Sequence, residues 1–153
     1  MIKIEGHVPF SSHPFSSHAS RLLAELGADR DVFDTAEALQ CYAGAAPVTE
    51  KSGRSRRVKF RRACNMTLRA TIHLWADRSR IKSTWAQASY LQKRTQGKGH
   101  ATALRCLALR WLKILWKMWQ ECAQYDSERH LRDQTHHGSW VISLVPQPTV
   151  QSN

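Results

Sequence analysis

Cysteine is scarce in this sequence, with only four copies among 153 residues. The four lie far apart, at Cys41, Cys64, Cys106 and Cys122. No Cys-x-x-Cys motif occurs, and of the eight histidines only His136 and His137 are neighbours, so the ligand spacing of a zinc site is missing. We therefore predict no metal site in this chain and interpret the cysteines as free cytosolic thiols.

A long apolar run is missing as well. The most apolar segment, residues 101–119, is interrupted by Arg105, Arg110, Lys113 and Lys117, whereas a membrane-spanning helix needs about 20 consecutive apolar residues. The first residues show no apolar run of signal-peptide length. Gly97-Lys98-Gly99 lacks the Lys-Ser/Thr pair of a phosphate-binding P-loop. These absences argue against a membrane partner and against nucleotide binding of the P-loop kind.

Acidic residues are few: 12 Asp and Glu stand against 23 Lys and Arg, which gives a formal net charge of +11. Between residues 51 and 94, thirteen Lys or Arg accompany one acidic residue, Asp77. A stripe this basic is typical of a nucleic-acid-binding surface, where neutralised phosphates release counterions. A solvated cationic face or a generic polyanion binder is the alternative.

One serine stands at the start of this basic stripe. Ser52 is followed by Gly53, which lets the backbone turn sharply and keeps the hydroxyl exposed. Arginines, which grip phosphate oxygens in a bidentate way, follow at once. The candidate nucleic-acid contacts are Lys51, Arg54, Arg56, Arg57, Lys59, Arg61, Arg62 and Arg69. From the residues alone, Ser52 either attacks a phosphodiester or only contacts phosphate or water.

The apolar periodicity predicts an all-α fold, a compact bundle of about five helices with a basic loop after the second helix and a poorly ordered C-terminal tail. The expected helices cover residues 19–26, 35–43, a stretch beginning after 65, 84–96 and 100–122. Asp34 and Glu37 match a capping box at the second helix, and Asn65 is the expected cap of the third. A short extended piece is expected at 140–145.

Apolar stripes predict which faces are buried. In the expected helix 100–122, one wide sector holds Leu104, Leu107, Ala108, Trp111, Leu112, Leu115, Met118, Trp119 and Cys122. The two preceding helices would bury Leu68, Ile72 and Trp75, and Trp85, Ala88 and Leu91. Because Trp111 and Trp119 lie inside the stripe, we expect them to pack in the core rather than stack on bases. Trp116 lies at its edge and is a candidate for contact with a partner.

Several blocks in fixed order carry a resemblance to a known family. They are RLLAELG at 21–27, YAGAAPVTEKSG at 42–53, RRACNMTLRATIHLWADRS at 61–79 and GHATALRCLALRWLKILWKMWQ at 99–120, followed by Tyr125-Asp126. Over about residues 21–141 the chain resembles the C-terminal domain of insertion-sequence transposases of the IS-110/IS-116/IS-902 type. In that family the serine of the Ser-Gly pair attacks DNA, and it aligns with Ser52.

The resemblance also implies partners and a location. They are DNA, a guide RNA, and either further copies of the chain or a RuvC-like domain, all in the bacterial cytoplasm at the nucleoid. The family's magnesium is held by four acidic residues of the RuvC-like domain, so no cofactor is expected on this chain. Arg54, Arg56 and Arg57 are the candidate phosphate clamps beside Ser52.

Two departures from the family define the expected domains. The 153 residues leave no room for the RuvC-like domain, and residues 12–16 lack the glycine-containing turn through which the family enters this region. We therefore expect a divergent leader at 1–18, the transposase helical domain at 19–125 and a polar tail at 126–153. A truncated transposase of this kind should not cleave DNA alone. The alternative is a non-catalytic helical remnant that only binds DNA or RNA.

Overall fold

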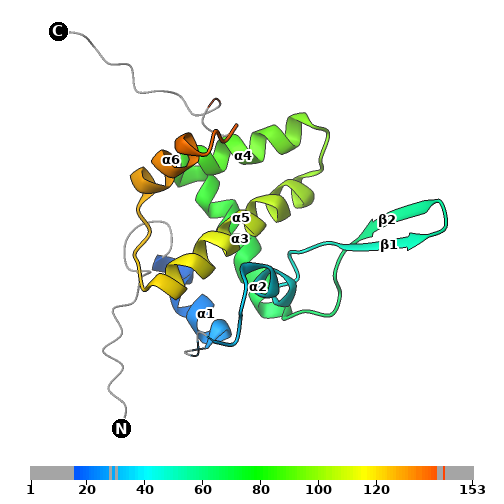
Figure 1. Cartoon of the computed structure of the whole chain (residues 1–153), viewed down its shortest axis with the longest axis horizontal. Helices are drawn as coiled ribbons and strands as arrows, with labels where there is room; N and C mark the ends of the chain where they lie inside the picture. The colour runs from blue at the N-terminus through cyan, green and yellow to red at the C-terminus, as the bar shows by residue number, and fades with distance from the viewer. Residues whose placement is uncertain (1–15, 28, 30, 141–142, 144–153) are drawn as a thin grey trace.

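The computed structural model describes residues 16–27, 29, 31–140 and 143. In this part of the chain, six helices and one two-stranded sheet follow in the order α1 Ser16–Leu26, α2 Ala36–Tyr42, β1 Val48–Ser52, β2 Ser55–Lys59, α3 Met66–Lys82, α4 Thr84–Thr95, α5 His100–Glu121 and α6 Ser127–His136. The helices gather into one body, and the sheet projects from it as a narrow arm (Figure 1).

Helix α5 is the centre of the core and packs against α2, α3 and α4, while α1 packs on α3. The stripe predicted for α5 is buried from Leu104 to Trp119, but Cys122 ends the helix in an exposed position. The α3 stripe is buried as predicted. On α4, Trp85 and Ala88 are buried, but the prediction for Leu91 is wrong because its side chain is 48% exposed.

Tryptophan rings hold α3, α4 and α5 together. The centroid of the Trp111 ring lies 5.1 Å from that of Trp75 and 4.7 Å from that of Trp85. The Trp111 indole donates a hydrogen bond to the buried Ser79 hydroxyl at 2.7 Å. The predicted packing role of Trp111 is therefore confirmed. Trp116 donates its indole N–H to the Phe33 carbonyl at 2.9 Å, so it ties α5 to the loop before α2.

The expected cap of the third helix is confirmed, and that of the second is shifted. Asn65 Oδ1 accepts a hydrogen bond from the Leu68 N–H at 2.9 Å at the start of α3. At α2 the cap is Thr35, whose hydroxyl accepts from the Ala38 N–H at 3.1 Å, not Asp34. The helix starts one residue later than the Asp34 capping box required, because Thr35 is itself a good capping residue.

The all-α prediction is wrong, because the expected basic loop is an antiparallel hairpin of β1 and β2. Its strands carry β-branched residues, and opposite charges meet across them: Glu50 pairs with Arg57 in the register, and its carboxylate lies 2.6 Å from Lys59 Nζ. The hairpin has no buried face, since every strand residue except Val48 is exposed. Sequence periodicity therefore gave no strand signal.

The predicted irregular tail is wrong over Ser127–His136, which form α6. Asp126 caps this helix by accepting from the N–H groups of Glu128 and Arg129 at 2.9 and 3.1 Å. The His130 ring lies against Trp85 at 4.8 Å between centroids. Most of the extended piece expected at 140–145 and most of the leader lie outside the described residues, and the domain boundaries stay a prediction.

Candidate nucleic-acid interface

Ser52 lies at the tip of the hairpin. It pairs directly with Ser55 in the register, which leaves Gly53 and Arg54 as a two-residue turn. Gly53 has φ +55°, and among the described residues Cys122 is the one non-glycine with positive φ, so Arg54 is not left-handed. A positive φ at the first central position only is the pattern of a type II′ turn, which strongly favours glycine there. The Ser-Gly pair thus has a structural reason as well as a candidate chemical one.

The two faces of the hairpin carry different groups. Because side chains alternate along a strand, the register places Ser52 and Ser55 on one face together with Glu50, Arg57 and Lys59. The other face carries the directly opposed pair Lys51 and Arg56, together with Thr49 and Val58. Like charges placed opposite one another destabilise a strand pair, so this second face favours an anionic partner.

The candidate clamps are therefore divided between the turn and the two faces. Arg57 shares the face of Ser52, Arg54 lies in the turn beside it, and Arg56 lies on the opposite face. All three follow Ser52 closely in the sequence, but the two-residue period of the strand places Arg56 and Arg57 on opposite faces. Ser55 was missed by the sequence analysis, although it lies directly opposite Ser52 and is also exposed.

Among the described residues, no general base lies at the serine. The Ser52 side chain is exposed at the end of β1, and no side-chain hydrogen bond of the described residues includes it. The one carboxylate on its face, Glu50, is already paired with Lys59. A serine hydroxyl is a weak nucleophile at neutral pH, so any chemistry at Ser52 needs a base brought by another domain, subunit or ligand.

The remaining candidate residues lie at the root of the hairpin, where the chain leaves α2 and enters α3. Arg61 is partly buried and Arg62 is exposed. Arg69, on α3, donates from Nη1 to the Arg61 carbonyl at 3.2 Å. Asn65 Nδ2 donates to Glu25 Oε2 at 2.7 Å and to the Tyr42 hydroxyl at 3.1 Å. The root is thus fixed to α1, α2 and α3, whereas the tip is free in solvent (Figure 1).

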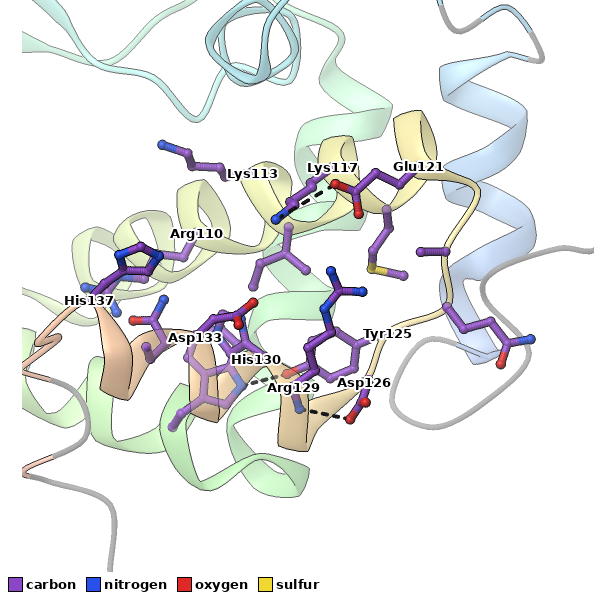
Figure 2. A pocket seen from close by; sticks show the side chains of 16 residues that line it. Arg110, Lys113, Lys117, Glu121, Tyr125, Asp126, Arg129, His130, Asp133 and His137 are labelled. Carbon is purple, nitrogen blue, oxygen red and sulfur yellow. Dashed lines mark hydrogen bonds and ion pairs between the residues drawn. The ribbon is translucent and has the colours of Figure 1, made fainter.

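A separate groove of about 560 Å³ lies between α4, α5 and α6 (Figure 2). Its lining mixes both signs of charge, with Arg110, Lys117 and Arg129 beside Glu121 and Asp133. Two of its lining residues are joined, because the Trp85 indole donates to the Tyr125 hydroxyl at 2.8 Å. Burial raises the pKa of Tyr125 to about 12. The groove shares no lining residue with the hairpin. Its basic and acidic lining residues are nearly balanced in number, so its charge does not single out nucleic acid as a ligand.

Two further properties concern the part of the chain that the structure describes. No three histidine, cysteine, aspartate or glutamate side chains gather there in a way that could hold a metal ion. No helix there is long and apolar enough to cross a membrane. None of the four cysteines forms a disulfide.

Comparison with known proteins identifies relatives. The chain is 40% identical over 110 residues to the "Mini-circle putative transposase for IS117" of Streptomyces coelicolor, an alignment covering 72% of this chain and 27% of that protein. It is 36% identical over 107 residues to the "Insertion element IS900 uncharacterized 42 kDa protein" of Mycobacterium paratuberculosis, covering 69% of this chain and again 27% of the relative. The chain therefore spans about a quarter of the length of these relatives.

The family assignment rests on a match to the model of a whole family, which covers half of this chain. Residues 16–92 match the sequence model of the Transposase IS116/IS110/IS902 family. This stretch runs from the start of α1 through the hairpin and α3 into α4, so it contains Ser52 and all of the candidate nucleic-acid contacts. The chain belongs to the IS116/IS110/IS902 family of transposases.

Proposed function

We propose that this chain is the DNA-gripping and serine-bearing part of a transposase, with the hairpin as the element that meets DNA and Ser52 as the nucleophile. The observation that carries the proposal is the place of Ser52, exposed beside a two-residue turn at the tip of a projecting cationic hairpin. A two-stranded ribbon fits the major groove of duplex DNA. Basic side chains on both faces of such a ribbon can contact phosphates on either side of the groove.

The proposed chemistry is a phosphoryl transfer with a covalent intermediate. The Ser52 oxygen forms a bond to a backbone phosphorus, the bond from that phosphorus to a bridging sugar oxygen breaks, and the serine proton passes through a base to the released hydroxyl. A second strand end then displaces the serine oxygen, which takes a proton back. Arg57 and Arg54, on the face and turn of Ser52, are the proposed partners of the phosphate charge.

We propose that the Ser52 hydroxyl is activated by a group outside the described residues, because none of the described residues supplies a base beside it. By resemblance to the family, an acidic RuvC-like domain with magnesium would supply it, and a guide RNA would select the DNA. The described side chains do not fit a magnesium site, so we assign no step to a metal held by them. A non-catalytic nucleic-acid-binding role is the second candidate, and the unassisted Ser52 hydroxyl is the observation that favours it.

The test is an adduct assay on denaturing gels with labelled duplex DNA. The chain is mixed with magnesium, the cognate RNA and a RuvC-like domain from a full-length relative. Wild type and Ser55→Ala should yield a covalent protein–DNA adduct, and Ser52→Ala should yield none while binding DNA as before. Ser55→Ala is a matched control, since both serines are exposed and lie opposite one another on one face.

Each other outcome of the assay has a definite meaning. An adduct in Ser52→Ala that disappears in Ser55→Ala would move the nucleophile to Ser55. No adduct from wild type with all components present would support the non-catalytic role. Adduct formation by the chain with magnesium alone would contradict the proposed need for a second domain.

A further inference from the structure

Phe60, the residue that follows β2, holds two arginines at the root of the hairpin. The Arg105 guanidinium carbon lies 3.8 Å from the centroid of the Phe60 ring, and that of Arg69 lies 4.8 Å from it. Arg69 comes from α3 and Arg105 from α5, so the ring fixes guanidinium groups from two helices beside the chain that returns from the hairpin. Such contacts between a cation and an aromatic face restrain the arginine in one place.

These arginines belong to a cluster with unused hydrogen-bond donors. Arg61 Nε, Arg105 Nε and His73 Nε2 are buried and have no hydrogen-bond partner within the described residues. Burial, together with the charges of Arg105 and Arg69, lowers the pKa of His73 below its ordinary value. Burial also lowers the pKa of Arg105, and Arg69 adds to this. His73, Arg69 and Arg105 are therefore close enough to influence one another electrostatically, and Arg61 joins them through its carbonyl, which accepts from Arg69 Nη1 at 3.2 Å.

No carboxylate compensates for this charge in the described part of the chain. The ion pairs there join Lys59 to Glu50, Arg80 to Asp77 and Lys117 to Glu121, and none includes a member of the cluster. Partly buried cations and unpaired donors cost free energy unless an anion or an acceptor meets them. A phosphate group offers both a negative charge and several acceptor oxygens.

We propose that Arg61, Arg69, His73 and Arg105 form a phosphate seat that binds one backbone phosphate of a nucleic-acid strand. This inference rests on the proposed nucleic-acid role of the hairpin and adds a second anchoring point to it. A five-residue strand spans roughly 17 Å at about 3.3 Å per residue, so the seat and Ser52 contact different phosphates. The seat thereby fixes where the strand lies at the root, while the tip carries the serine.

The test compares single-charge substitutions by titration with a fluorescent 30-base-pair duplex and with an RNA stem-loop, each over a range of salt. Arg105→Gln should weaken binding roughly tenfold and reduce the slope of log affinity against log salt by about one. Arg132→Gln is the matched control, because it removes the same charge from an exposed position on α6, away from the hairpin. It should change affinity and slope much less.

A second variant separates placement of the arginines from their charge. Phe60→Leu keeps every charge but removes the ring that holds two guanidinium groups, so affinity should fall while the salt slope stays close to wild type. Phe60 is 38% exposed, so this variant should fold even where Arg105→Gln is less stable. Thermal unfolding followed by circular dichroism checks both.

The outcomes distinguish this inference from the function on which it rests. Wild type that binds neither probe at low salt would defeat the nucleic-acid role itself. The seat alone would be overturned if wild type binds nucleic acid but the substitutions have no specific effect. In that case Arg105→Gln would have the same affinity and salt slope as Arg132→Gln, and Phe60→Leu would have the same affinity as wild type. If Arg105→Gln weakens binding of only one of the two probes, the duplex DNA or the RNA stem-loop, the seat binds that kind of nucleic acid.

Discussion

Gly44 is the residue at which the chain leaves α2 and turns toward the hairpin. It has φ +66°, and a Cβ built at this position would lie 2.5 Å from Cys64 Sγ and 2.7 Å from Cys64 Cβ. Two constraints therefore act on one residue: a left-handed backbone and a close approach to the returning chain. Together they keep the two ends of the hairpin side by side.

This double constraint predicts the effect of adding one methyl group. Gly97 also has positive φ, +76°, but nothing lies within 4 Å of a Cβ there. Gly97→Ala should cost about 1–2 kcal/mol of unfolding free energy from backbone strain alone. Gly44→Ala should cost about 1–3 kcal/mol more, because Cys64 or the backbone must shift. Urea denaturation of both variants measures the difference, and equal losses would contradict the close approach.

At the scale of the element, the helices that bury an apolar stripe could be predicted and the other elements could not. Helix α5 shows its stripe in the sequence because its neighbours cover one side of it. The hairpin and α6 have no such stripe: the hairpin is exposed on both faces, and α6 contains no fully buried residue. Both are specified by local chemistry, a Ser-Gly-Arg-Ser turn and an Asp126 cap, which periodicity does not detect.

Two histidines give the helices a pH dependence. Burial, as the largest cause, lowers the pKa of His130 on α6 and of His73 on α3 below the ordinary 6.5, and Arg110 and Arg105 respectively add to it. Asp133 acts the other way at His130. Because the folded state favours the neutral rings, the unfolded chain binds more protons in the window below about 6.5. The stability that the two neutral histidines contribute is therefore fully present above this window, and the unfolding free energy falls as the pH decreases through it.

Urea denaturation from about pH 7.5 to about pH 5 checks this expectation. The unfolding free energy should decrease toward acid in wild type, and His73→Gln and His130→Gln should each reduce the decrease. His136→Gln is the control, since His136 is exposed near the end of α6. An unfolding free energy that rises toward acid, or a control that behaves like the other two variants, would contradict the account.

At the scale of the whole molecule, the charged stripe in the sequence and the proposed nucleic-acid interface overlap only in part. The sequence located Ser52 and the basic residues around it, because they are contiguous. It did not include Arg105, whose guanidinium lies over the Phe60 ring from α5, or His73 on α3, which lies close enough to Arg105 and Arg69 to be influenced by their charges. Neither did it separate Arg56 from Arg57, because that division depends on a strand it did not predict.

The hairpin is the part of the molecule on which the account depends. An isolated two-stranded hairpin is marginally stable in water, and this one projects from the helices with nearly all its residues exposed (Figure 1). Its amide protons should exchange quickly in the free chain. Contact with DNA should hold the ribbon together and slow that exchange, in a manner that weakens between roughly 50 and 200 mM salt.

Hydrogen exchange of the full chain with and without duplex DNA at low salt therefore shows whether the hairpin meets DNA. We predict slower exchange over residues 48–59 in the presence of DNA, with the amides of α6 unchanged. Protection confined to the groove between α4, α5 and α6, with residues 48–59 exchanging as fast as in the free chain, would contradict it.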